Sequence, residues 1–211
     1  MPHQSNKKPQ LVEREARHQC LIYHGAPSQQ LPALGAVLKR KLSEGYRCMY
    51  INSIPMVNGM RSYLWTIGVD VESDTAKGHL VFSSESLLTE GTTLDVKVML
   101  KTLENALDKA LQDGYKGLWA TGDMTFEFGY KENLAKLLEY EYGLEELMAK
   151  RMELCGICQY HQDTLPKEAT PQALLTHPVI FINETLSRVN SNYVPFGAKN
   201  NKSNPDTWES S

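Results

Sequence analysis

Short apolar runs alternate along this chain with longer stretches of helical periodicity, and this alternation constrains the fold more than any other feature. The apolar runs are solid, as in Pro178-Val-Ile-Phe-Ile182, where no polar residue interrupts the pattern. Solid runs are typical of strands in a sheet that helices cover on both faces, because both rows of side chains are then buried. The sequence therefore predicts an α/β fold, a three-layer sandwich with a mostly parallel central sheet.

Six strands and five main helices follow from this pattern. The predicted strands lie at about residues 18–24, 46–51, 78–83, 116–121, 153–160 and 178–182. The predicted helices lie at about residues 31–43, 54–65, 93–112, 131–151 and 171–177. The helix over 93–112 has the most continuous apolar stripe, and Thr93 is its predicted N-cap. Ligands of parallel sheets bind beyond the carboxyl ends of the strands, so the loops at those ends are where we expect a site.

Length and charge limit the organisation and the partners. The 211 residues are enough for one sizeable core, and we expect a single domain over 17–196 between flexible tails at 1–16 and 197–211. A formal net charge of -3 gives no reason to expect direct nucleic-acid binding. No apolar run approaches the roughly 20 residues of a membrane span, and no signal peptide is evident, so we expect a cytoplasmic protein without membrane attachment. Four cysteines in that compartment predict no disulfides.

The turn between the first strand and the first helix, Tyr23 to Pro32, lies where nucleotide-binding proteins place a phosphate loop. Counted from Gly25, the pattern GxxxxGK[ST] requires a second glycine, a lysine and a hydroxyl, but the chain has Gln30, Leu31 and Pro32. The turn therefore lacks the groups that hold a triphosphate. A turn that leads into a helix N-terminus still offers backbone N–H groups to another polar ligand.

A second candidate follows the fourth predicted strand, in Gly122-Asp-Met-Thr-Phe-Glu-Phe128. Asp123 and Glu127 are expected at the carboxyl edge of the sheet, where carboxylates bind metals, transfer protons or accept hydrogen bonds from a ligand. The alternative is structural: Asp123 caps the turn and Glu127 is solvated.

The third candidate is Cys155-x-x-Cys158-x-x-His161 on the fifth predicted strand. Residues three apart on a strand face opposite sides of the sheet, so the spacing argues against a zinc site made by both thiols. Cys158 and Tyr160 are expected on one face, where they line a pocket or fill the core. His24 and His161 end two predicted strands, and the hypothesis that they meet stands beside the alternative that each is a structural hydrogen-bonding residue.

Several of these segments together resemble the MEDS family, the methanogen/methylotroph sensory domain first defined in a regulator of dichloromethane utilisation. The resemblance covers about residues 17–195 and rests on the following segments: His18-x-Cys20-x-x-Tyr23, Trp119-Ala-Thr-Gly-Asp-Met-Thr-Phe-Glu127, the helix with Glu139, Glu141 and Leu144, Cys155-x-x-Cys158-x-Tyr160, and His177-Pro178. It implies a RecA-like, P-loop-NTPase-type topology, similar to circadian-clock ATPase domains, with a degraded nucleotide motif. It also implies recognition of small hydrocarbon derivatives, usually within a histidine kinase or a DNA-binding regulator.

This chain departs from the family at Phe126, where members often have Trp. Because no kinase, receiver or helix-turn-helix segment fits beside the domain, we expect signalling through a partner protein or self-association, or an excised domain.

The leading hypothesis is a non-enzymatic sensory module that binds a small organic ligand and signals to a regulatory partner such as a histidine kinase or transcription regulator. It needs no cofactor and no metal. The predicted ligand-binding residues are Tyr23, His24, Gly25, Ser28, Gln29, Trp119, Asp123, Met124, Glu127, Cys158, Tyr160 and His161. One alternative is a divergent nucleotide-binding or metal-assisted hydrolytic enzyme of the RecA-like class that uses Asp123 and Glu127. Another is an interaction protein that docks through the helix over 131–151.

Overall fold

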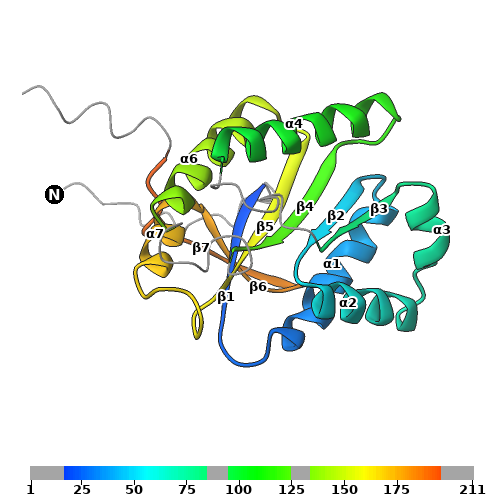
Figure 1. The fold of residues 1–211 in the computed structure, drawn as a ribbon, viewed down its shortest axis with the longest axis horizontal. Helices are drawn as coiled ribbons and strands as arrows, with labels where there is room; N and C mark the ends of the chain where they lie inside the picture. Colours follow the sequence, from blue (N-terminus) through cyan, green and yellow to red (C-terminus); the bar gives the residue numbers. More distant parts are fainter. Residues whose placement is uncertain (1–16, 85–94, 125–133, 196–211) are drawn as a thin grey trace, which may run out of the picture.

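The computed structural model of the protein describes residues 17–84, 95–124 and 134–195 (Figure 1). Its strands are β1 (His18–Tyr23), β2 (Arg47–Ile51), β3 (Leu80–Ser83), β4 (Leu118–Asp123), β5 (Leu154–His161), β6 (Val179–Asn183) and β7 (Leu186–Val189). Its helices are α1 (Leu31–Ser43), α2 (Ile54–Thr66), α3 (Val71–Ala76), α4 (Val96–Gln112), α6 (Leu134–Lys150) and α7 (Ala169–Thr176), with a 3-10 turn, η1 (Pro27–Gln30), before α1. The predicted α/β fold is confirmed.

The described strands form one sheet in the order β3-β2-β4-β5-β1-β6-β7. Neighbouring strands are parallel throughout, except that β7 runs antiparallel to β6. The prediction of a mostly parallel sheet is therefore confirmed, and the structure adds a seventh strand to the six that the apolar runs indicate.

The strand order decides which helices cover which face. The connections from β1 to β2 and from β2 to β3 run toward the β3 edge, whereas the three later connections between parallel strands run toward the β7 edge. Parallel crossovers are right-handed in almost all proteins, so the two directions place helices on opposite faces. Figure 1 shows this arrangement, with α1, α2 and α3 on one side of the sheet and α4, α6 and α7 on the other. The layers are those of the predicted three-layer sandwich.

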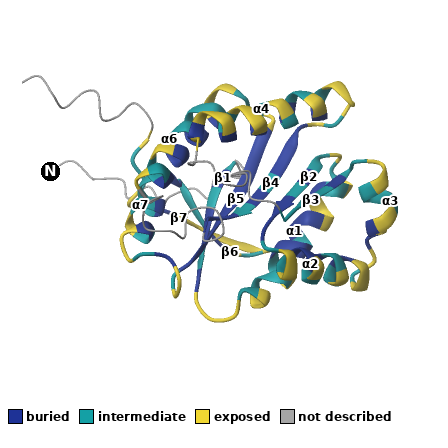
Figure 2. Cartoon of the chain, in the orientation of Figure 1, coloured by how far each residue is buried: buried dark blue, intermediate teal, exposed yellow. Residues whose placement is uncertain are grey.

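Each face of the sheet has its own apolar core, and the central strands are buried on both (Figure 2). On β5, Cys158 and Tyr160 belong to the core under α4, α6 and α7, whereas Cys155 and Ile157 belong to the core under α1 and α2. The alternation of a strand explains this division. It confirms that Cys155 and Cys158 face opposite sides and that Cys158 and Tyr160 share one.

Two glycines bring the elements of the α4 and α6 side close together. A Cβ atom on Gly156 would overlap the carbonyl oxygen of Ala120 on the neighbouring strand β4, and one on Gly143 would overlap the side chain of Leu100 on α4. The missing side chains therefore let α6 pack against α4 and let β5 lie against β4. These four elements contribute most of the lining of the cavity described below.

The structure differs from the sequence-based expectation in four places. The N-cap of α4 is Asp95, whose Oδ1 accepts hydrogen bonds from the backbone N–H groups of Lys97 and Val98 at 3.0 and 3.2 Å, and Thr93 lies outside the described residues. Helix α3 has six residues, too few for a clear period, and all four residues of β7 are exposed, so neither produces an apolar pattern. Strand β4 extends through Asp123, which is thus part of the sheet and not of the loop after it.

Candidate functional site

The predicted site residues of the first loop lie where the carboxyl ends of β1 and β5 meet. Asp163, just after β5, accepts a hydrogen bond from the backbone N–H of Gly25 at 2.7 Å, and its other oxygen lies 3.0 Å from Nδ1 of His24. His161 Nε2 lies 2.8 Å from the carbonyl oxygen of Gly25 and 3.5 Å from the Asp163 carboxylate. His24 and His161 thus lie near the same carboxylate, that of Asp163, and their joint role in a site stays a prediction.

This loop is poorly suited to an anionic ligand. The Gly25 N–H, which a strand-to-helix turn would offer to a phosphate, is bonded to the chain's own carboxylate. That N–H and then the His24 side chain lower the pKa of Asp163, so the carboxyl group is ionised at neutral pH and repels a second anion. Ser28 and Gln29 lie on η1 with exposed side chains, and their predicted contacts with a ligand stay predictions.

Three further predicted residues lie on the α1 and α2 side of the sheet. Trp119 is 2% exposed and packs in the apolar core of that face, away from Met124 and Cys158 on the other face. The Tyr23 ring is buried there too and stacks on His161 with ring centroids 5.0 Å apart. Burial, followed by the charge of Asp123, raises the pKa of Tyr23, so the Asp123 carboxylate lies near that phenol at the end of β4. The sheet therefore divides the predicted residues into separate groups.

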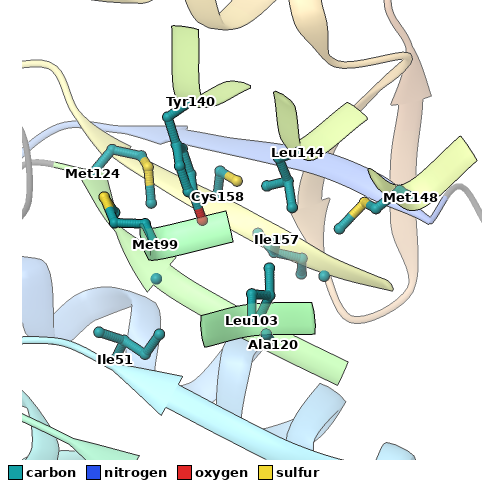
Figure 3. A pocket seen from close by; sticks show the side chains of 12 residues that line it. Ile51, Met99, Leu103, Ala120, Met124, Tyr140, Leu144, Met148, Ile157 and Cys158 are labelled. Atoms are coloured by element: carbon teal, nitrogen blue, oxygen red, sulfur yellow. The ribbon is translucent and has the colours of Figure 1, made fainter. Parts of the chain in front are cut away.

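A cavity lies on the opposite face, between the sheet and the helices α4 and α6. Twelve residues line it: Ile51, Met99, Leu103, Ala120, Gly122, Met124, Tyr140, Leu144, Met148, Gly156, Ile157 and Cys158. Figure 3 shows the side chains of Met99 and Leu103 from α4 facing those of Tyr140, Leu144 and Met148 from α6. Of the predicted site residues, Met124 and Cys158 belong to this lining.

The size and the chemistry of the cavity restrict what it can hold. Its volume is about 40 Å³, a few times the roughly 10–15 Å³ that one water molecule needs and far less than the space a nucleotide requires. The lining is aliphatic and thioether-rich, and its polar side-chain groups are the Tyr140 hydroxyl and the Cys158 thiol. Thioethers are polarisable and adapt to irregular apolar guests. The cavity therefore suits an apolar or weakly polar molecule of a few non-hydrogen atoms.

A buried polar cluster adjoins this cavity at Cys158. His18 from β1, Glu141 from α6, Cys158 from β5 and His177 after α7 each present one ligand-type atom, and these atoms all lie within 4.8 Å of one another. Glu141 is at the centre: its Oε2 lies 3.3 Å from His18 Nε2, 3.4 Å from His177 Nε2 and 3.9 Å from Cys158 Sγ. Its other oxygen accepts a hydrogen bond from the Tyr160 hydroxyl. Three distant segments, β1, β5 and the end of α7, thus converge on one carboxylate of α6.

Burial dominates the electrostatics of this cluster. It lowers the pKa of His18 and of His177 to about 3, so both imidazoles are neutral at physiological pH. Burial also raises the pKa of Glu141, although His177 and the Tyr160 hydroxyl oppose that change, and burial followed by the charge of Glu141 raises the pKa of Cys158. The chain therefore holds a carboxyl group and a thiol where solvent stabilises neither anion.

The sequence did not single out three members of this cluster as site residues. His18, Glu141 and His177 lie in the segments that carry the family resemblance, but nothing in their spacing shows that they meet, because they are up to 159 positions apart. The predicted residues Cys158 and Tyr160 do lie here. Glu127 lies outside the described residues, and so its predicted role stays a prediction.

The fold and the site define an α/β domain with a small apolar cavity beside a buried polar cluster, and its first strand-to-helix turn lacks the phosphate-loop residues. The family described as MEDS, the MEthanogen/methylotroph, DcmR Sensory domain, matches residues 17–178. The chain belongs to this family. It is similar to the transcriptional repressor DcmR of Methylorubrum extorquens, with 24% identity over 160 residues that cover 76% of this chain and 57% of the repressor.

The family description assigns the domain a sensory role. The chain spans little more than half of the repressor it matches, so the activity of that whole protein does not carry over by itself. None of the helices in the described ranges has the length and apolar character needed to cross a bilayer.

Proposed function

We propose that this domain is a non-enzymatic sensor that binds a small organic molecule in the cavity between the sheet and the helices α4 and α6. The observation that carries the proposal is the lining: Met99, Met124, Met148 and their aliphatic neighbours enclose a space of about 40 Å³, with Tyr140 and Cys158 as local polar groups. Apolar cavities of this kind stay free of water and take up apolar guests. A hydrocarbon derivative of a few non-hydrogen atoms, such as dichloromethane, fits this chemistry.

The proposed site has the character of a binding site and not of a catalytic one. The Cys158 thiol is held in its protonated form, because burial and the nearby Glu141 raise its pKa, and a thiol is a far weaker nucleophile than a thiolate. At the carboxyl edge of the sheet, the Asp163 carboxylate already accepts the hydrogen bond of the Gly25 N–H group, which argues against a phosphate there. Both observations support the sensory proposal over the alternative of a divergent nucleotide-binding or hydrolytic enzyme.

The proposed signal passes through α4 and α6. Both helices contribute side chains to the cavity, and the overlap at Gly143 and Leu100 shows how closely they pack. A guest that enlarges the cavity must displace one of them, since close-packed interiors do not deform smoothly. We propose that a partner protein, a histidine kinase or a transcription regulator, or a second copy of the chain, senses this displacement. The similarity to a transcriptional repressor supports the regulatory part.

Methyl NMR of the methionines tests the site, because the chain contains its own controls. Met99, Met124 and Met148 line the cavity, Met60 is fully buried in the other core and Met152 is 66% exposed. Titration with dichloromethane, with xenon as a chemically inert probe of the same space, is expected to shift the first three methyl resonances and to leave the last two in place. Equal shifts of Met60, or no shift at Met124 and Met148, would refute the cavity as the binding site.

A nucleotide titration separates the sensor from the enzyme alternative. We expect millimolar ATP with magnesium to leave both the methyl spectrum and the thermal midpoint unchanged. Micromolar ATP binding with turnover that Asp123→Asn abolishes would establish the enzyme instead.

A further inference from the structure

We propose that His18, Glu141, Cys158 and His177 form a closed site for one divalent transition-metal ion, of which zinc is the best match. The four side chains come from β1, α6, β5 and the end of α7, and all four are buried. Two imidazoles, a thiol and a carboxyl group are the donor types that zinc sites in proteins use. Cys158 also lines the cavity, but the inference rests on the geometry of these four side chains and requires no guest there; the buried thiol of the metal-free chain would lose its proton on binding the ion.

Four of the six distances between the donor atoms are close to the edges of a tetrahedron around one ion, and all six are within 4.8 Å. Zinc bonds of about 2.3 Å to sulfur, 2.0–2.1 Å to nitrogen and 2.0–2.2 Å to oxygen give tetrahedral edges of roughly 3.3 Å between nitrogen and oxygen and 3.5 Å to sulfur. The observed nitrogen-to-oxygen distances are 3.3 Å for His18 with Glu141 and 3.4 Å for His177 with Glu141. Cys158 Sγ lies 3.8 Å from His18 Nε2 and 3.9 Å from Glu141 Oε2. Small side-chain adjustments complete the coordination.

His177 supplies the second, independent observation. Its Nδ1 lies 2.7 Å from the backbone carbonyl oxygen of Ala173, which only accepts hydrogen bonds, so Nδ1 carries the proton. Nε2 is then an acceptor. It is fully buried, has no hydrogen-bond partner among the described residues, and lies 3.4 Å from a carboxylate oxygen that is itself an acceptor. Two acceptors that face each other in an apolar interior need a proton or a cation between them, and a metal ion bound to both atoms meets that need. A bond from Nδ1–H to a backbone carbonyl is also the usual outer support of a metal-bound histidine.

Charge and outer contacts favour the bound ion as well. A carboxylate and a thiolate together neutralise a divalent cation, which leaves no net charge in the core. The remaining oxygen of Glu141 accepts a hydrogen bond from Tyr160, so the carboxylate is held with Oε2 toward the other three ligands. His177 presents an unprotonated Nε2 to the other three ligands, and a metal-bound imidazole needs such a nitrogen. All four positions are filled by protein atoms, as in structural zinc sites and unlike catalytic ones.

Metal analysis of the whole chain tests the proposal. The protein is expressed in zinc-supplemented medium, because a buried site loads most readily while the chain folds, and is then dialysed against a weak chelator. We expect about one zinc per chain in the unaltered protein. Cys158→Ser and His177→Gln are expected to lower the bound zinc to less than a tenth. Cys155→Ser is the matched control, since it changes the other thiol of the same strand, on the opposite face, and is expected to retain full zinc.

A second measurement keeps the proposal testable if the substituted chains do not fold. X-ray absorption of the unaltered zinc-loaded protein is expected to show one sulfur and three nitrogen or oxygen ligands, and the cobalt-loaded protein is expected to show a thiolate-to-cobalt absorption band. Protein free of zinc after dialysis, zinc that survives Cys158→Ser, or a coordination shell without sulfur would each overturn the proposal. The last two outcomes would indicate metal held elsewhere, for example by His24 and Asp163 at the surface.

Discussion

Glu141→Gln is the substitution for which the buried cluster makes the sharpest prediction, because its effect on stability should change sign with metal. Glu141 is fully buried and one of its oxygens accepts a hydrogen bond from Tyr160, which a glutamine carbonyl can accept equally well. The glutamine amide would stand where Oε2 now lies, 3.4 Å from His177 Nε2, and would give up only the weak hydrogen bond that Oε2 accepts from the Cys158 thiol at 3.9 Å. That nitrogen has no donor in the native cluster, and the substitution supplies one.

The expected change in the free energy of unfolding has two sources: His177 Nε2 gains a hydrogen-bond donor, and the buried charge of the Glu141 carboxylate is removed. A buried polar atom without a partner costs about 1–3 kcal/mol, so in metal-free protein at pH 8 we expect Glu141→Gln to raise the free energy of unfolding by about that amount. Burial raises the pKa of Glu141, and such a group stabilises the fold below its unfolded pKa of about 4.5 and loses that contribution as the pH rises. The advantage of glutamine is therefore expected to grow between pH 5 and pH 8.

Zinc should reverse the result. An amide is a poor substitute for an anionic ligand. A loss of about 1,000-fold in zinc affinity would remove roughly 4.1 kcal/mol of stabilisation by zinc, which outweighs the gain of about 1–3 kcal/mol expected without metal.

The assay is urea denaturation of the same two proteins with excess EDTA and with saturating zinc. Glu139→Gln is the control, since Glu139 is exposed on the same helix and its substitution is expected to change stability by less than about 0.5 kcal/mol in both conditions. A metal-free Glu141→Gln protein that is less stable than the unaltered chain would refute the assignment of His177 Nε2 as an unsatisfied acceptor. Stabilisation with both EDTA and zinc would refute the metal site but not the acceptor.

Three further predictions concern other parts of the same architecture. Gly156→Ala places a methyl group against the Ala120 carbonyl oxygen and is expected to lower the free energy of unfolding by about 3 kcal/mol in urea denaturation. The control is Gly114→Ala, which is expected to lower it by about 1–2 kcal/mol, because the φ of 86° is strained for alanine but the surroundings are open. In metal-free protein, burial lowers the pKa of His177 to about 3, so the unfolded chain takes up a proton that the folded chain does not, and the free energy of unfolding falls as the pH drops below 6.5. His177→Gln is expected to reduce the slope of the free energy of unfolding against pH by about 1.4 kcal/mol per pH unit between pH 6.5 and pH 4.5. All four cysteines are buried, and so a thiol reagent at pH 8 is expected to modify them in urea but not in the native chain; rapid native labelling of Cys158 would contradict its burial.

The sequence predicts the layers of this fold well because the layers depend on patterns within short segments. The first helix is predicted at 31–43 and observed over Leu31–Ser43, since its apolar positions recur at helical spacing between a proline-containing start and a glycine stop. Strand β5 is predicted at 153–160 and observed over Leu154–His161, with every residue buried. The strand alternation even places Cys155 and Cys158 on opposite faces before any coordinates are known. Elements without a buried face, such as β7, leave no such pattern.

The site was less predictable because it depends on which segments become neighbours. Topology brings β1 between β5 and β6, and only then do His18, Cys158 and His177 converge. A sequence pattern places a residue on a strand or near its end, but strand order decides what faces it. The expectation of one site at the carboxyl ends therefore mixed residues from both faces, with Trp119 in one core and Met124 in the other.

Helix α6 contributes side chains to both the cavity and the buried polar cluster, so a movement of this helix affects both. Tyr140 lines the cavity, and the next residue, Glu141, is the centre of the polar cluster. Adjacent helical residues point about 100° apart, so one turn of α6 faces both spaces at once. Cys158 borders the cavity and the cluster from the sheet side. A rigid-body shift of α6 that makes room for a guest must therefore change the distances from Glu141 to His18 and His177. If the guest changes the affinity of the cluster for an ion by some factor, thermodynamic linkage requires that the ion change the affinity of the cavity for the guest by the same factor.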